Sequence, residues 1–332
     1  MNESKVNSKQ TPERRTPGVS VVLPILDEER FLAGAISAIL AQRYDGPLEV
    51  ILALGPSRDR TNEIAAKLAA KDPRVVLVEN PSGRTAAALN LAIAASKFPI
   101  ICRIDGHAEI SPTYISSAVR VLGETQAVNV GGIMAAVGIG AFERAVASAM
   151  RSPLGVGAAK FHTGGKAGPT DTVYLGVFDK AALLAAGGYD ERYTRAQDWE
   201  LNYRLRQAGG IIWFDPELIV TYRPRPNLKA LSKQYFEYGR WRRAVGRNHK
   251  GTINLRYLAP PVTVAIIALS LVLGATINAI YFLPAGMYLL GNVVGSFFIG
   301  KNLKEKIELP IILATMHFSW GIGFITSPSD LI

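Results

Sequence analysis

The chain has 332 residues, a single cysteine and a formal net charge of +10. One cysteine excludes an intrachain disulfide, and Cys102 lies in an apolar run where a buried core residue is expected. A charge of +10 would suit nucleic acid, but between Arg223 and Arg256 ten Lys or Arg accompany one acid, Glu237. Because nearly all of the excess is local, we expect membrane lipid rather than nucleic acid as the partner of this segment.

The N-terminal part of the chain changes character after residue 18. Residues 1–18 are polar and lack the apolar core of a secretory signal, so a disordered tail is expected there. From residue 19 onward, short apolar runs alternate with longer helical patterns, which predicts an α/β domain with crossover helices. The expected strands are 19–23, 48–54, 75–78 and 99–104, and the expected helices are 28–41, 61–71 and 84–96.

A second block, roughly 126–222, mixes short strands with helices and glycine-rich loops. Within it, His162–Pro169 is expected to be a mobile loop and Gln197–Gln207 a helix. Residues 226–249 then have the pattern of an amphipathic helix, so 226–256 is expected to be a basic segment that leads to the membrane.

The C-terminal part, 257–332, is expected to be a membrane region of two or three helices. No charged residue occurs between Arg256 and Lys301, which is enough chain for two crossings of about 20 residues each. We expect a hairpin of helices at 258–276 and 280–300, and a third apolar run, 310–326, that either spans or re-enters. The basic segment before the hairpin predicts that domain 19–225 faces the cytoplasm at the inner membrane.

Acidic side chains follow the first and fourth expected strands, where ligands of open α/β sheets gather. Asp27-Glu28-Glu29 follow the first strand, and helix capping and ligand binding explain them about equally well. Asp105 and His107 follow the fourth strand with one glycine between them. A carboxylate with an imidazole suits Mn²⁺ or Mg²⁺, although Asp105 could also only stabilise a turn.

Asp198 opens the expected helix 197–207. An Asp in this position is often only a cap, but a carboxylate is also the general base that an inverting glycosyl transfer needs. The chain contains no H-E-x-x-H, G-x-S-x-G or Walker motif, and no G-x-G-x-x-G after the first strand. These absences argue against metalloprotease, serine hydrolase, NTPase and nicotinamide-dependent functions.

Several blocks in the same order resemble those of family-two inverting glycosyltransferases, most closely the ExoA-like enzymes of succinoglycan and other exopolysaccharide synthesis. The blocks are SVVLPILDEERFL, GPSRDRT, NPSGRTAAALN, RIDGHAEI, GGYDERYTRAQDWELNYRLRQAGG and YRPRPNLKALSKQYFEYGRWRR. Asp27 stands where the family usually has Asn, and His107 replaces the second acid of its D-x-D element. The resemblance implies a GT-A nucleotide-diphospho-sugar transferase fold, with a Rossmann-like mixed sheet followed by C-terminal transmembrane helices.

The resemblance also implies roles for individual residues. Asp198 corresponds to the catalytic base, and Asp105 and His107 correspond to the ligands of a divalent metal, Mn²⁺ or Mg²⁺. The nucleotide-sugar donor, expected to be UDP-linked, would contact Pro24, Leu26, Glu28, Ser57, Asp59, Arg84, Asn90 and Asp105. The acceptor, expected to be a glycan or a polyprenyl-diphosphate-linked sugar, would lie near Gln197, Trp199, Gln234, Arg240 and Trp241.

Two alternatives remain beside a non-processive transferase, which would act alone or with other glycan-assembly transferases. A processive polysaccharide synthase would need a translocation channel, and two or three helices are few for one. It would also carry Q-x-x-R-W, whereas Gln234, Arg240 and Trp241 have a different spacing. A catalytically silent scaffold would keep the fold alone, and the presence of Asp59, Asp105 and Asp198 together argues against it.

Overall fold

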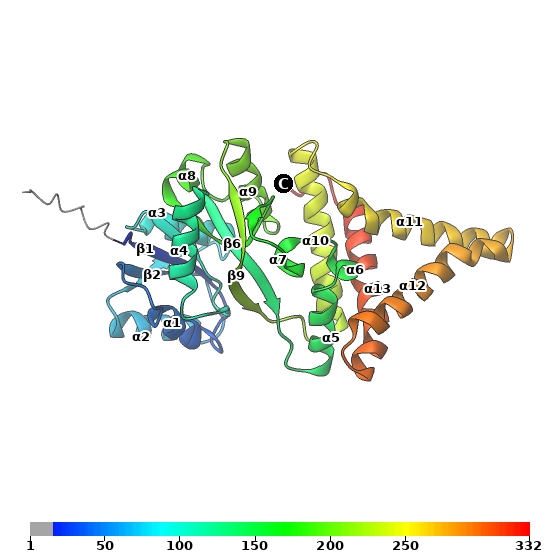
Figure 1. Ribbon diagram of the computed structural model, residues 1–332, viewed down its shortest axis with the longest axis horizontal. Helices are drawn as coiled ribbons and strands as arrows, with labels where there is room; N and C mark the ends of the chain where they lie inside the picture. The colour runs from blue at the N-terminus through cyan, green and yellow to red at the C-terminus, as the bar shows by residue number, and fades with distance from the viewer. Residues whose placement is uncertain (1–15) are drawn as a thin grey trace, which may run out of the picture.

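The computed structural model describes residues 16–332, so most of the tail expected at 1–18 lies outside the described residues. One mixed sheet forms the centre of the α/β domain. Its strand order is β3-β2-β1-β4-β8-β6-β9-β5, and β7 pairs with β9 (Figure 1). Strands β1 to β4 are parallel, and β8 runs antiparallel to β4 and β6. The strands are β1 Val19–Ile25, β2 Leu48–Leu54, β3 Val75–Glu79, β4 Ile100–Arg103, β5 Glu109–Ile110, β6 Asn129–Ala136, β7 Gly168–Pro169, β8 Tyr174–Asp179 and β9 Ile212–Tyr222.

The helices of the α/β domain cover both faces of this sheet. They are α1 Leu32–Leu40, α2 Thr61–Lys71, α3 Thr85–Ala95, α4 Tyr114–Thr125, α5 Ala141–Met150, α6 Pro153–Val156, α7 Lys160–Thr163, α8 Lys180–Ala185 and α9 Gln197–Gln207. The C-terminal part consists of α10 Leu228–Asn248, α11 Leu255–Thr276, the 3₁₀ turn η1 Ala279–Phe282, α12 Leu283–Ile299 and α13 Leu303–Ile325.

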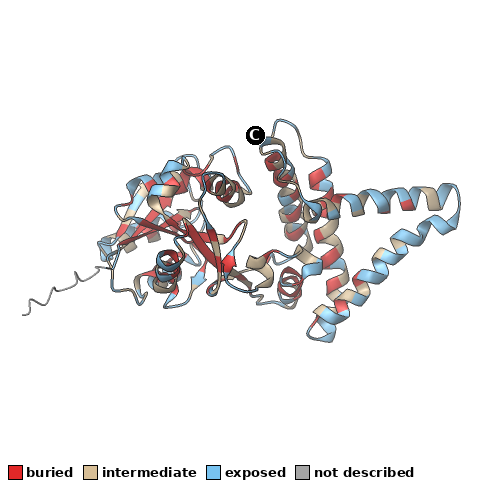
Figure 2. Ribbon diagram, turned by 45° about the horizontal axis from the view of Figure 1, so that its top comes forward, coloured by how far each residue is buried: buried red, intermediate tan, exposed pale blue. Residues whose placement is uncertain are grey.

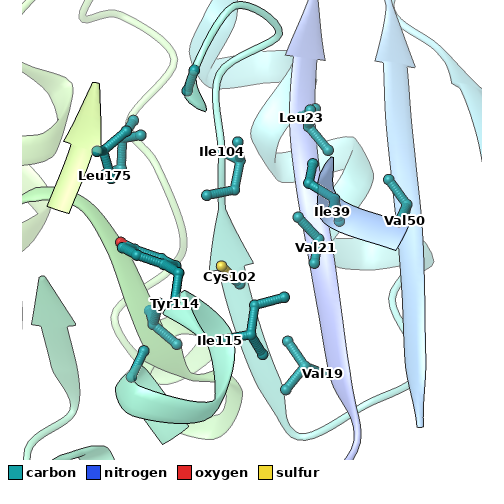
Figure 3. Packing of buried hydrophobic residues seen from close by; sticks show 14 of the residues in the cluster. Val19, Val21, Leu23, Ile39, Val50, Cys102, Ile104, Tyr114, Ile115 and Leu175 are labelled. Carbon is teal, nitrogen blue, oxygen red and sulfur yellow. The ribbon is translucent and has the colours of Figure 1, made fainter. Parts of the chain in front are cut away.

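Two apolar clusters hold the helices to the sheet, because side chains of successive strand residues point to opposite faces. Val19, Val21 and Leu23 join α1, α2 and α4 on one face (Figure 3). Val22 joins α3, α8 and α9 on the other face. Cys102 lies in the first cluster with no exposed surface, and burial raises the pKa of its thiol to about 12, which confirms the expected core role.

Most of the expected elements are confirmed, including the helix Gln197–Gln207, but three differ. Helix α1 begins at Leu32 rather than at residue 28, because the Glu28 and Glu29 backbone N–H groups donate to side chains of the β2–α2 loop. The segment His162–Pro169, expected to be a loop, contains the end of α7 and the short strand β7, which pairs with β9. The third apolar helix begins at Leu303, seven residues before Pro310.

The C-terminal helices divide into two groups. Helices α11 and α12 project from the molecule and meet at η1, where the Asn278 side chain accepts from the Ile280 N–H, as the expected hairpin requires (Figure 1). Helix α13 instead packs along α10 and is more buried than the hairpin helices, which have only a few buried residues (Figure 2). By length and composition, the spans Leu255–Thr276, Ala279–Ile299 and Leu303–Ile325 could each cross a membrane.

Helix α13 shares a hydrophobic core with the α/β domain. Leu309, Ile312, Leu313 and Met316 are buried with side chains of β6, α5 and α10. The boundary expected at residue 257 therefore does not separate two independent cores. The physical reason is that α13 has two apolar faces. One face packs against the α/β domain and α10, and only the other is exposed.

Candidate active site

The loops after β1 and β2 are tied together by polar side chains. The Ser57 hydroxyl accepts from the Asp27 N–H at 3.2 Å, and the Asp27 carboxylate accepts from the Arg58 N–H at 2.7 Å. Asp27 has a φ of 56°, a left-handed conformation that Asp and Asn adopt more readily than most residues. These bonds explain why a short polar residue is found at this position, where the sequence departs from the expected Asn.

Asp59 serves as the second tie between the same loops. Its two carboxylate oxygens accept from the Glu29 N–H at 3.1 Å and the Thr61 N–H at 3.0 Å. Hydrogen bonding from Thr61 lowers the pKa of the Asp59 carboxyl. The bonds give Asp59 a structural role in shaping the edge of the sheet, and its contact with a nucleotide stays a prediction.

Asp105 and His107 lie at the end of β4, as the sequence predicts. The His107 Nδ1 atom is 2.7 Å from Glu28 Oε1, across the gap between the ends of β1 and β4. Gly106 allows this approach, since a Cβ there would come within 2.9 Å of the Glu28 side chain. Hydrogen bonding to Glu28 raises the pKa of His107.

This arrangement fits a divalent metal only if a ligand completes the shell. Within residues 16–332, no group of three His, Cys, Asp or Glu side chains is placed to hold a metal. A carboxylate at Nδ1 favours the tautomer that leaves the Nε2 lone pair free, which is the usual setting of a metal-binding histidine. Asp105 and His107 could therefore supply two ligands, with diphosphate oxygens as the others.

Arg103 is the residue of the site that the sequence reasoning missed. It is the last residue of β4, and its side chain is 5% exposed. Its guanidinium donates through Nη2 to Asp105 Oδ1 at 3.2 Å and through Nη1 to Asp198 Oδ1. A charged residue inside the apolar run Ile100–Ile104 was the available signal, because a buried cation requires anionic partners. Arg103 thus brings the candidate metal ligand and the candidate base together.

Asp198 lies in the first turn of α9, after Ala196 in a left-handed conformation with φ of 61°. The Asp198 side chain is 31% exposed, so the carboxylate remains accessible. Burial raises the pKa of Asp198, and the positive charge of Arg103 opposes that rise. A partly buried carboxylate that stays accessible and has a raised pKa is suited to accept a proton from a hydroxyl.

Other candidate bases are engaged elsewhere. Glu200, two residues further along α9, is 1% exposed and pairs with Arg204 at 2.7 Å and with His249 at 3.1 Å. Asp190 is paired with Arg192 at 2.6 Å. Asp198 is likewise paired, with Arg103, but its side chain is the most exposed of the three and its cation is shared with Asp105.

Arg84 and Asn90, the two expected donor-binding residues of the block NPSGRTAAALN, have different surroundings in the structure. Arg84 is exposed at the N-terminal end of α3 and is free to approach a ligand. The Asn90 amide instead donates to the Tyr189 carbonyl at 2.8 Å and accepts from the Tyr189 N–H at 2.8 Å. Asn90 thereby anchors the loop that leads to α9. Pro24 lies at the end of β1 and Leu26 directly follows it, with Leu26 exposed.

Trp199 connects the base helix with the membrane-side helices. The Arg242 guanidinium carbon of α10 lies 3.9 Å from the centre of the Trp199 ring and 3.9 Å from that of Tyr257 on α11. Burial between the rings lowers the pKa of Arg242 to about 10. A planar cation between two aromatic faces is a stabilising arrangement, so α9, α10 and α11 meet at this stack.

The remaining acceptor-side candidates are mostly packed against protein. Gln197 is buried, and Trp241 is buried beside Tyr193 in a cluster that includes Trp199. The Gln234 amide donates to the Tyr222 and Tyr238 hydroxyls at 2.7 and 2.8 Å. Arg240 pairs with Glu237 at 2.9 Å. Of these, Trp241 and Gln197 share the region of Asp198, and their contact with an acceptor stays a prediction.

Comparison of the chain with known proteins shows the family to which it belongs. The model of the family described as Glycosyl transferase family 2 matches residues 20–184. The succinoglycan biosynthesis protein ExoA of Rhizobium meliloti (strain 1021) is 33% identical over 92% of this chain and 93% of its own. A dolichyl N-acetyl-alpha-D-glucosaminyl phosphate 3-beta-D-2,3-diacetamido-2,3-dideoxy-beta-D-glucuronosyltransferase of Methanococcus voltae is 22% identical over 92% of this chain and 95% of its own.

A solved structure shares the fold. The mannosyltransferase PcManGT from Pyrobaculum calidifontis, in complex with GDP-Man and Mn²⁺, aligns with a TM-score of 0.62 and 17% identity over 92% of this chain and 87% of its own. At that identity the likeness concerns the fold alone. Since the similarity to ExoA extends over nearly the whole of both chains, the protein belongs to glycosyl transferase family 2 and is a glycosyltransferase with a GT-A fold.

Proposed function

We propose that this protein is an inverting, metal-dependent transferase that moves a sugar from a nucleotide-sugar donor to a lipid-linked or glycan acceptor. The observation that carries the proposal is the bridge formed by Arg103, which holds the Asp105 and Asp198 carboxylates at one point at the edge of the sheet. This arrangement puts Asp105, which would lie near the leaving diphosphate, beside Asp198, which would lie near the attacking hydroxyl.

In this proposal the chain's own residues perform three tasks. Asp198 accepts the proton of the acceptor hydroxyl as it attacks the anomeric carbon from the side opposite the leaving group. Asp105 and the His107 Nε2 atom would hold Mn²⁺ or Mg²⁺ together with the donor, and the metal would neutralise charge on the diphosphate. Glu28 orients the His107 ring through its bond to Nδ1.

The acceptor and the place of reaction are proposed from the surroundings of the site. The ExoA relative supports a role in exopolysaccharide or cell-envelope glycan assembly. The apolar helices and the basic segment Arg223–Arg256 favour an acceptor presented at the membrane, such as a polyprenyl-diphosphate-linked sugar. By the positive-inside rule, that segment supports a position of the α/β domain on the cytoplasmic face of the inner membrane.

The donor nucleotide is the point that an experiment must decide. The sequence resemblance favours UDP, whereas the similar solved structure contains GDP-Man. Purified full-length protein in lipid nanodiscs would be incubated with a panel of UDP- and GDP-sugars, with Mn²⁺, Mg²⁺ or EDTA, and with or without a membrane lipid extract. We expect nucleotide diphosphate release from one donor class that needs both metal and lipid extract. Absence of sugar on any lipid or glycan with every donor would contradict the proposal.

A further inference from the structure

Both ends of helix α13 are attached to the same body of protein. Near its start, Glu305 Oε2 accepts from the Ser148 hydroxyl of α5 at 3.0 Å. After its end, the Ser327 hydroxyl donates to the Arg240 carbonyl of α10 at 2.9 Å, and Arg247 donates to the Ser327 carbonyl at 3.2 Å. A helix of this length is about 34 Å long at about 1.5 Å per residue, so its ends would lie at opposite surfaces if it spanned.

Helix α10 packs against α13 between these two attachments, with its closest contacts in the second half of α13. The backbones nearly touch, since a Cβ on Gly239 would lie 2.0 Å from the Trp320 carbonyl oxygen and one on Gly323 would lie 2.1 Å from that of Phe236. Between these points and the start of α10, the Ser232 and Ser319 hydroxyls are 2.9 Å apart. The two helices therefore lie at the same depth relative to any membrane.

That shared depth cannot be the hydrocarbon core. Helix α10 carries charges along its whole length, at Lys229, Lys233, Glu237, Arg240, Arg242, Arg243 and Arg247. Each of these charges is strongly unfavourable at the centre of a bilayer. A spanning α13 would have to draw this charged helix into the membrane with it.

Apart from Lys304 near its start, the exposed side chains of α13 form one apolar stripe. Ile307, Ile311, Ile322 and Ile325 are exposed at helical spacing, while the opposite face is buried in the protein core. A helix that turns one apolar face toward lipid, while its other face packs against protein, lies in the plane of the membrane–water interface. The hairpin differs, because α11 and α12 are exposed on most sides and no charged residue occurs between Arg256 and Lys301.

Cations gather on the same platform. Arg243, Arg247 and Lys250 line an open hollow of about 330 Å³ with Gly246 and Ile253, at the turn from α10 into α11. No acid lines this hollow. Anionic lipid headgroups attract juxtamembrane cations of this kind.

We propose that the hairpin α11–η1–α12 is the part of the described chain that enters the hydrocarbon core, and that α13 lies with α10 in the plane of the lipid headgroups. The stripe Ile307–Ile325 then faces the acyl chains from the interface. It follows that the residues after α13 lie on the same side as the catalytic domain, where Leu331 and Ile332 pack beside Tyr193 and Trp241.

The depth of α13 tests the proposal. Single cysteines for spin labels would be placed at Ile307, Thr315 and Ile322 of the full-length protein, in vesicles of phosphatidylcholine and phosphatidylglycerol. Cys102 is fully buried, so its background labelling is low. Leu269→Cys and Leu289→Cys in the hairpin serve as references. Depth is read from the relaxation of each label by oxygen and by a water-soluble nickel chelate.

We expect the three α13 labels to share one shallow depth while both hairpin labels lie deep. A deep Thr315 label between shallow Ile307 and Ile322 labels would show a spanning helix and overturn the proposal, as would three deep labels. Sidedness gives an independent reading. A membrane-impermeant thiol reagent should reach Asp330→Cys and Lys250→Cys in the same preparation of vesicles. Labelling of the two from opposite sides would also overturn the proposal.

Discussion

Replacement of Arg103 by glutamine should change the pH dependence of the reaction. Arg103 donates to Asp198 and holds the pKa of that carboxyl down against the effect of burial. An opposite charge at this range lowers a carboxyl pKa by about 1–3 units. Without the cation, the pKa of Asp198 should rise by a similar amount, and each unit corresponds to about 1.4 kcal/mol.

The sign of the effect follows from the role of the base. Asp198 accepts a proton only when it is ionised, so the rate falls as the pH falls through its pKa. In Arg103→Gln the acid limb of kcat/KM should therefore move upward by about 1–3 pH units. Since a carboxyl with a raised folded pKa is stabilising only when protonated, the Tm of the variant should also fall as pH rises.

The assay is the rate of nucleotide release across a range of pH, with Arg204→Gln as the control. Arg204 is also paired with an acid, Glu200, but has no bond to Asp198. The control should lose stability and keep the acid limb in place. An unshifted acid limb in Arg103→Gln, or a rate loss that higher pH does not restore, would refute the reasoning.

Three further predictions concern the metal, the core and the aromatic stack. His107→Ala should weaken Mn²⁺ affinity in the presence of donor by at least about tenfold by calorimetry, since an imidazole ligand is lost. Leu313→Ala should destabilise the protein by about 2–5 kcal/mol because Leu313 is 0% exposed, whereas Leu269→Ala, at a position 58% exposed, should have little effect. Arg242→Lys should lower the free energy of unfolding by about 1–2 kcal/mol, and with it the Tm, because an ammonium cannot stack on both rings.

Each of these predictions has a clear contrary result. Unchanged, still metal-dependent donor binding in His107→Ala would remove that residue from the metal site. Equal Tm values for Leu313→Ala and Leu269→Ala in detergent would mean that α13 is not part of the folded core. A wild-type Tm in Arg242→Lys would show that the stack between α9 and α11 adds no stability.

Sequence reasoning succeeded where one periodicity governs the local structure. The strands β1, β2 and β4 are buried on both faces, so each is a largely apolar run bounded by polar loops, and their bounds are close to those expected. Helix α9 has the expected bounds as well. The end of α12 and the hairpin turn were predictable because uncharged sequence of this length has few alternatives to a membrane helix.

Features that depend on tertiary contacts could not be predicted. The contact of Asn90 with the donor stays a prediction, and the sequence did not show that its amide bonds to Tyr189, which is 99 residues away. Arg103 was overlooked because its partners Asp105 and Asp198 come together only in the folded sheet. Helix α13 looks like a membrane span by composition, and only its contacts with α5 and α10 show that half of its apolar surface is used by the core.

The central claim is that Asp198 is the general base, and Asp198→Asn tests it most directly. In the structure Ala196 is the N-cap of α9, so the role that competes with that of a base is the pairing of Asp198 with the buried Arg103. Loss of the pair alone lowers stability. Loss of a base also removes the group that accepts the hydroxyl proton, and such losses are about 100- to 10,000-fold. We predict a lower Tm and a donor affinity close to that of the wild type, with sugar transfer reduced by at least about 100-fold at a temperature where the variant is folded. Near-normal transfer by Asp198→Asn would contradict the account.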